Sequence, residues 1–178
     1  MKLSAPIKGI TQFAKAPVDW TGTVAWGEGG YYSRIFMNVK GREPKGIIEA
    51  GDYEKVRDDL AARLEGMTDE SGQVLGTKVY KPEKIYREVR GVAPDLIVLF
   101  GDLHWRSVGT LGHGKVWTYE NDTGPDDANH AMHGLYILTG PGVAARGRQD
   151  GRWNQIAPTL RQLLGLAQPA EPLASPLL

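Results

Sequence analysis

Two segments of the chain carry apolar residues at the spacing of an amphipathic α-helix. In the first they are Tyr53, Val56, Leu60, Ala61 and Leu64, and in the second Ile156, Leu160, Leu163 and Leu164. Asp52 precedes the first pattern as a candidate N-cap, and Gly66 follows it as a stop signal. Asn154 is the candidate cap of the second helix, Pro158 falls near its first turn, and Gly165 ends it.

Two short, uninterrupted apolar runs, Leu96–Phe100 and Leu135–Thr139, predict β-strands. Continuous apolar runs between turn residues suit strands buried on both faces of an α/β sheet, so we expect both runs in one sheet. Residues 20–39 mix β-branched and aromatic side chains around a glycine-rich break, which predicts two strands and a turn. A strand within Gln73–Tyr80 and a short helical turn after Pro82 complete a mixed α/β arrangement.

The length of 178 residues fits one domain or one lobe of a larger one. We expect residues 1–178 to form a single lobe. Prolines and glycines interrupt residues 1–19, which predicts an irregular N-terminal arm, and residues 168–178 predict an extended tail.

Composition narrows the classes of partner and of chemistry. Lys+Arg and Asp+Glu number 21 each, so the net charge is zero and nothing predicts binding to nucleic acid or to a membrane surface. The chain has no cysteine, which excludes disulfides, thiolate zinc sites and a cysteine nucleophile. The first residues lack the apolar core of a signal peptide, and no apolar run is long enough to span a bilayer. We expect a cytoplasmic protein.

Candidate chemistry concentrates between the two apolar runs. All four histidines lie there, namely His104, His113, His130 and His133, with carboxylates at Asp95, Asp102, Glu120, Asp122, Asp126 and Asp127. Imidazole and carboxylate groups are common ligands of zinc, manganese and iron. The spacing of His130 and His133 fits one side of a helical turn, but Gly134 also allows a bend into the next strand. Arg106 either holds an anion or pairs with a carboxylate.

Three segments resemble a known family: AWGEGGYYSRIFMNVKGREPKGII (25–48), PDLIVLFGDLHWRSVGTLG (94–112) and ENDTGPDDANHAMHGLYILTGPGV (120–143). The family consists of microbial phosphohydrolases or phosphomutases of the alkaline phosphatase superfamily, in the type I phosphodiesterase/nucleotide pyrophosphatase branch. The segment 155–166 is similar to the closing helix of that superfamily, and the ending 172–177 is similar too. The resemblance extends from about Lys8 to the end of the chain.

The resemblance implies an alkaline-phosphatase-like sheet with flanking helices, of which this chain would be the C-terminal portion. Such enzymes use two divalent metal ions, with zinc or manganese expected, and a Ser or Thr nucleophile that attacks phosphorus. His133, followed by Gly134, matches the family's late metal ligand, and we expect it exposed at the beginning of a strand. The resemblance places His130 beside the site and not on the metal, and Asn129 and Arg106 are further candidates for positions beside it.

The nucleophile segment and the Asp-His-Gly ligand segment of the family have no counterpart in these residues, so no catalytic residue is assigned here. The resemblance therefore implies a fragment of a phosphoester hydrolase that is inactive alone, with a small phosphoester as substrate of the longer enzyme. One alternative is a phosphomutase of the same superfamily, and another is a non-catalytic binding or assembly module. We also expect self-association through a surface that an N-terminal half would cover.

Overall fold

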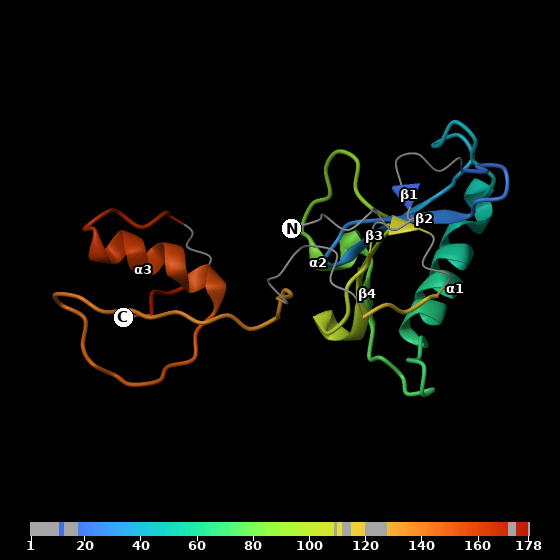
Figure 1. Cartoon of the computed structure of the whole chain (residues 1–178). Coiled ribbons are helices and arrows are strands. Elements are labelled where there is room, and N and C mark those ends of the chain that lie inside the picture. Colours follow the sequence, from blue (N-terminus) through green and yellow to red (C-terminus); the bar gives the residue numbers. More distant parts are fainter. Residues whose placement is uncertain are drawn as a thin grey trace, which may run out of the picture. The chain divides into compact units, whose positions relative to one another are not determined.

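The computed structural model describes residues 11–12, 18–108, 110–111, 115–119, 128–170 and 174–177. The chain divides into two compact units, Met1–His133 and Gly134–Leu178, whose helices and strands are labelled in Figure 1. The first unit contains the sheet and the longest helix, and the second contains one helix with the segments around it.

The first unit is built on a four-stranded antiparallel sheet. Its strands are β2 (Ala25–Glu28), β3 (Ser33–Met37), β4 (Lys78–Tyr80) and β5 (Leu96–Leu99), in the order β2-β3-β5-β4. Residues 29–32 join β2 to β3, which confirms the predicted pair of strands and turn. A separate short ladder pairs β1 (Thr11–Gln12) with β6 (Thr110–Leu111). Helices and sheet together give the expected α/β class.

Helix α1 (Tyr53–Glu65) packs along one face of the sheet, as Figure 1 shows. Its predicted limits are confirmed, with Asp52 at the N-cap position and Gly66 at the C-cap, although the Asp52 side chain makes no capping hydrogen bond. The core beneath α1 contains Met37, Val39 and Ile48, with Ala25, Ile47, Tyr53 and Val56 packed against it.

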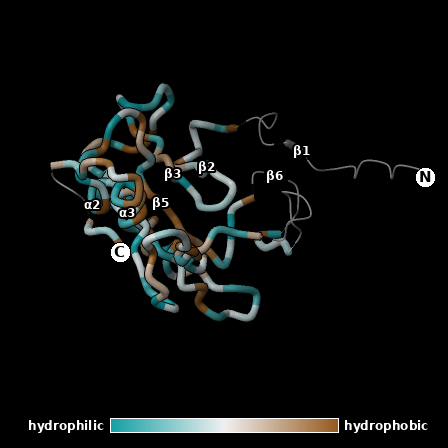
Figure 2. Tube along the Cα trace, turned by 90° about the vertical axis from the view of Figure 1, so that its left-hand side faces the viewer, coloured by the Kyte–Doolittle hydropathy of each residue, from teal (hydrophilic) through white to brown (hydrophobic). Residues whose placement is uncertain are grey.

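Strand β5 confirms the apolar run at Leu96, but not its predicted burial on both faces. Leu96 and Val98 are fully buried, whereas Ile97 and Leu99 are partly exposed. Successive strand residues point to opposite faces, and only the face of Leu96 and Val98 is covered by α1. The neighbours of β5 are antiparallel, and antiparallel sheets tolerate one solvated face. Figure 2 shows β5 as a largely hydrophobic stretch of the chain.

The predicted strand Leu135–Thr139 is wrong, because these residues have irregular backbone. Leu135 is 89% exposed and Ile137 is 83% exposed. No ladder among the described residues includes this run, and a strand needs a neighbour to accept its backbone hydrogen bonds. The hydroxyl of Tyr136 instead donates to the carbonyl oxygen of Gln149 at 3.1 Å.

The second unit is organised by helix α3 (Ile156–Leu163), which follows the 3-10 helix η4 (Trp153–Gln155). Asn154 therefore lies inside η4, and Gln155 occupies the N-cap position of α3, which corrects the expected cap. The helical segment starts two residues earlier than expected, with Arg152 at the N-cap of η4, whose backbone N–H donates to Gln155 Oε1 at 2.8 Å. The chain returns to the helix where the Leu177 N–H donates to Thr159 Oγ1 at 2.8 Å.

Two further predictions concern helix ends and a short helix. Gly165 adopts a φ of 65° just after α3, a conformation that a glycine accepts without steric cost, as expected for the stop signal. Pro158 is buried within α3. Helix α2 (Pro82–Ile85) begins at the proline that predicted it. No helix among the described residues is long and apolar enough to cross a membrane.

Candidate functional site

The most buried charges of the first unit form a structural network around Asp95, the residue before β5. Its carboxylate is 3% exposed and accepts hydrogen bonds from the Met37 N–H at 2.6 Å and the Tyr53 hydroxyl at 2.5 Å. The Arg42 guanidinium donates to both carboxylate oxygens at 2.7 Å. Burial alone would raise the pKa of Asp95, but the hydrogen bonds from Arg42, Tyr53 and Met37 outweigh it, and the pKa is lowered.

The pKa values of two partners of Asp95, Tyr53 and Arg42, are raised. Burial and the hydrogen bond to Asp95 raise the pKa of Tyr53 to about 12. The hydrogen bond to Asp95 is also the main cause of a raised pKa of Arg42. From α1, the buried Arg57 donates to the Asp95 carbonyl oxygen at 2.7 Å and to both carboxylate oxygens of Glu83 at 2.8 Å. Every one of these groups is satisfied within the fold, so the network stabilises the sheet and is not a reaction site.

A second polar region lies where the chain leaves β5. The 3-10 segment η3 (Phe100–Leu103) contains three successive left-handed residues, Gly101 (φ 55°), Asp102 (φ 52°) and Leu103 (φ 75°). A left-handed conformation costs a residue with a side chain roughly 1–2 kcal/mol. Strained backbone of this kind is found preferentially at functional sites, because the surrounding structure must hold it in place.

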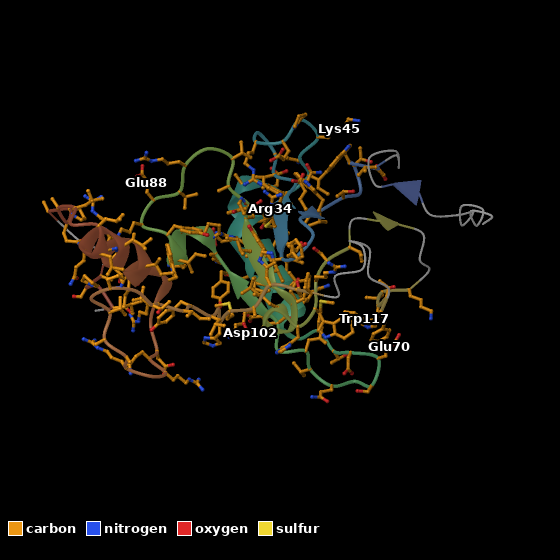
Figure 3. All side chains as sticks on the ribbon, turned by 60° about the vertical axis from the view of Figure 1, so that its left-hand side comes forward. Arg34, Lys45, Glu70, Glu88, Asp102 and Trp117 are labelled. Atoms are coloured by element: carbon orange, nitrogen blue, oxygen red, sulfur yellow. The ribbon has the colours of Figure 1, made fainter. Side chains whose placement is uncertain are left out.

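Contacts on both sides hold this strained turn. Lys78 of β4 donates from Nζ to Asp102 Oδ2 at 2.8 Å. Asp102 Oδ1 is buried and has no hydrogen-bond partner among the described residues. The Leu103 carbonyl oxygen accepts a hydrogen bond from Asn129 Nδ2 at 2.6 Å, which ties the distant segment 128–130 to the turn. Figure 3 labels Asp102 near the end of the sheet.

Asn129 and His130 reach the hairpin turn between β2 and β3 through Tyr31. The Asn129 Oδ1 accepts a hydrogen bond from the His130 backbone N–H at 2.9 Å. The His130 ring lies 4.3 Å from the Tyr31 ring, centroid to centroid. The Arg106 guanidinium carbon lies 5.9 Å from the centroid of the same ring. Tyr31, Arg106, Asn129 and His130 are called the Tyr31 cluster below.

The loop that carries Arg106 is joined directly to the hairpin turn. Ser107 Oγ donates to the Gly29 carbonyl oxygen at 2.7 Å. Gly29 has a φ of 115°, and a Cβ atom there would overlap the Tyr32 carbonyl oxygen. Only glycine fits this position, so the sequence of the turn fixes the path that brings Tyr31 to Arg106.

The Tyr31 cluster offers groups that suit an anion. A guanidinium presents a planar fork of donors that matches phosphate or carboxylate oxygens, and an imidazole supplies one donor when neutral and two when protonated. The Asn129 amide nitrogen already donates to the turn, so this residue positions its segment. Trp105, next to Arg106, lies 5.2 Å from the Trp117 ring and 5.7 Å from the Tyr119 ring, so an intrinsic fluorophore stands beside the cluster.

His133, the expected metal ligand, is exposed as predicted. The strand that was expected to begin after it is not formed. In the part of the chain that the structure describes, no three His, Asp or Glu side chains gather in a way that could hold a metal ion. The remaining candidates His113, Glu120, Asp122, Asp126 and Asp127 lie outside the described residues. The described residues therefore do not assemble a metal centre, and His133 offers one imidazole.

Comparisons with protein-family models, with curated proteins and with solved structures find no match to this chain. The structure brings together three residues that the sequence placed beside a site, namely Arg106, Asn129 and His130. It adds Tyr31, which sequence reasoning missed because an aromatic residue after a glycine-rich turn is ordinary in a hairpin. It also adds the left-handed turn at Asp102, whose sequence signal was a Gly-Asp pair directly after a buried strand.

Proposed function

We propose that this chain is the C-terminal part of a metal-dependent phosphoester hydrolase of the phosphodiesterase/nucleotide pyrophosphatase type, with an alkaline-phosphatase-like sheet. The observation that carries the proposal is that Arg106 and His130 contact the Tyr31 ring, while Asn129, the neighbour of His130, donates to the strained turn. The resemblance of segments 94–112 and 120–143 to one family supports the proposal, because these segments carry the three residues. The α/β class agrees with that assignment.

In the proposed reaction the chain's own residues bind and orient the phosphoester. Arg106 uses its donor fork on the non-bridging phosphoryl oxygens, where negative charge increases in the transition state. His130, whose ring also contacts Tyr31, supplies a second donor. Asn129 donates a hydrogen bond to the Leu103 carbonyl oxygen, and this contact positions the neighbouring residue His130. Tyr31 contacts both side chains, and the Arg106 guanidinium lies within cation–π distance of its ring.

The nucleophile and most metal ligands of the proposed enzyme are assigned to residues beyond these 178. His133 would contribute one ligand to a zinc or manganese ion. When bound, that ion would stabilise the negative charge on the phosphoryl oxygens. A single exposed imidazole binds a metal ion weakly, because affinity requires several converging ligands. The described residues alone would therefore not hold the metal ion that the reaction requires.

The test measures hydrolysis of bis(4-nitrophenyl) phosphate by a longer protein that contains this chain, with zinc or manganese added. We expect turnover by the longer protein and none by the 178-residue chain. Arg106→Ala and His130→Ala should each lower kcat/KM at least about tenfold, because each removes a donor to the transferred group. Arg63→Ala is the matched control, since Arg63 is exposed on α1 and, among the described residues, its ion pair is with Asp59 on the same helix, at 2.9 Å.

Three results would separate the alternatives. Phosphate binding by the longer protein without turnover would favour a binding or assembly module. With a sugar phosphate as substrate, transfer of the phosphoryl group to another hydroxyl of the sugar, without release of inorganic phosphate, would favour a phosphomutase. Equal kcat/KM for the wild type and the Arg106→Ala and His130→Ala variants would refute the proposed role of the Tyr31 cluster.

A further inference from the structure

A groove of about 540 Å³ lies on the face of the sheet that α1 does not cover. Met37 packs against α1, and by strand alternation Arg34 of β3 points to the opposite face. Arg34 pairs in register with Ile97 of β5, and both residues line the groove with Leu99. The loop after α2 forms the opposing wall, with Tyr86 and Val89 among its lining residues.

The lining is mainly apolar and aromatic, with three charged side chains. Two of these charges cancel, because Arg90 Nη2 lies 2.6 Å from Glu88 Oε2. The third, Arg34, has its carboxylate partner Glu28 at 4.0 Å, which is longer than a hydrogen bond, and the Arg34 side chain is 47% exposed. The groove therefore presents one weakly paired cation beside Ile97 and Leu99. Figure 3 labels Arg34 on the sheet and Glu88 on the loop that follows α2.

We propose that this groove binds a small, planar aromatic molecule that carries one anionic group. Its volume falls within the range of about 300–1,000 Å³ that is usual for small-molecule sites, which combine an apolar lining with a few polar groups. Ile97 and Leu99 remove the ring from water, Tyr32 and Tyr86 offer aromatic faces, and Arg34 pairs with the anion. A carboxylate and a phosphate both meet the requirement.

This site is separate from the Tyr31 cluster and does not rest on the proposed hydrolase function. Tyr31 contacts His130, whereas the next residue, Tyr32, lines the groove. A ligand in the groove and a phosphoester at the cluster would thus contact different side chains. Variants of Arg34 test the groove without touching Arg106 or His130.

The experiment titrates the 178-residue chain with 2-naphthoate by calorimetry, and with phenyl phosphate as the phosphate form. 2-Naphthamide, which is neutral, and 2-naphthylmethylammonium, which is cationic, are the matched ligands. We expect saturable one-to-one binding of both anions, at least about tenfold weaker binding of the amide, and no binding of the cation, because Arg34 forms a charged contact with the anion alone. Amide and naphthoate binding of equal strength would overturn the proposal, and so would no saturable binding of either anion.

Three variants locate the ligand. Arg34→Gln should weaken naphthoate binding by about tenfold while leaving amide binding unchanged, and Arg34→Lys should restore part of the loss, since it keeps the charge without the fork. Arg63→Gln, remote from the groove on α1, should bind as the wild type does. If Arg34→Gln fails to fold, NMR shift mapping on the wild type decides instead. Naphthoate-induced shifts confined to residues outside Tyr32, Tyr86, Val89 and Ile97 would refute the site.

Discussion

Replacing Asp95 by asparagine removes the charge at the centre of the buried network while keeping the shape of the side chain. The carboxylate accepts hydrogen bonds from Met37, Arg42 and Tyr53, and only 3% of the residue is exposed. An asparagine has one acceptor oxygen and places an NH₂ group where a second acceptor stood. At least one of these donors then faces another donor without a partner.

The expected loss is about 3 kcal/mol in the free energy of unfolding. Removing one member of a buried ion pair costs about 3–5 kcal/mol, because the remaining charge stays uncompensated. The Arg42 side chain is 43% exposed, so water recovers part of its solvation and the lower end of that range applies. Tyr53→Phe removes a single hydrogen bond from the same network and should cost about 1 kcal/mol.

Urea denaturation followed by tryptophan fluorescence and circular dichroism measures both losses. Trp20 and Trp26 report on the first unit, because Trp26 belongs to the edge strand β2 and the Trp20 ring contacts it at 5.2 Å. Asp59→Asn is the control, because Asp59 forms an exposed pair with Arg63 on α1 and should change stability by less than about 0.5 kcal/mol. An Asp95→Asn loss no larger than that of the control would refute the assigned role of the network.

The pH dependence gives an independent check. The pKa of Asp95 is lowered in the folded state, so at acidic pH the folded protein binds fewer protons at this carboxyl than the unfolded chain does. The stabilisation is fully present above the unfolded pKa of about 3.9 and is lost as pH falls through the lowered folded value. The difference in stability between wild type and Asp95→Asn should therefore be constant near neutral pH and narrow below about pH 4. A difference that widens on acidification would contradict the sign of the shift.

Three further predictions follow from other parts of the chain. Gly29→Ala should lower the melting temperature by several degrees, because Gly29 has a positive φ and an added Cβ would overlap the Tyr32 carbonyl oxygen. Gly30→Ala should leave the melting temperature nearly unchanged, since a Cβ there meets no atom, and equal melting temperatures of the two variants would contradict this reasoning. In a longer protein with metal bound, His133→Ala should lower metal content and turnover by about 10- to 100-fold or more, and unchanged values of both would refute the ligand assignment. Leu135 and Ile137 are exposed apolar residues, so we expect concentration-dependent self-association by light scattering that a double replacement by Ser reduces, and a monomer at high concentration would refute it.

The candidate site was only partly predictable from the sequence. The sequence indicated Arg106 as a possible anion ligand and His130 and Asn129 as neighbours of a site. In the structure Arg106 and His130 contact the Tyr31 ring, and Asn129 donates to the Leu103 carbonyl oxygen. Tyr31 was not named, because its role depends on contact with residues far along the chain. The left-handed turn at Asp102 was not expected either, since a residue other than glycine adopts this conformation only when tertiary contacts stabilise it.

Elements whose causes are local could be predicted from the chain alone. Helix α1 (Tyr53–Glu65) has Asp52 and Gly66 at its cap positions, and α2 begins at Pro82. Both were predictable because helical periodicity and capping involve residues within a few positions of each other. Two strands around a glycine-rich turn and the strand at Leu96 were likewise specified by short runs of residues suited to a sheet.

Features that depend on partners distant in the sequence could not be predicted in this way. The apolar runs at Leu96 and Leu135 look alike, yet only the first finds neighbouring strands, because a strand exists through hydrogen bonds to another segment. The burial of Asp95 among Arg42, Tyr53 and Met37 likewise joins residues that are remote in sequence. A groove beside Arg34 arises because α1 covers one face of the sheet, and the choice of face depends on packing of the whole unit.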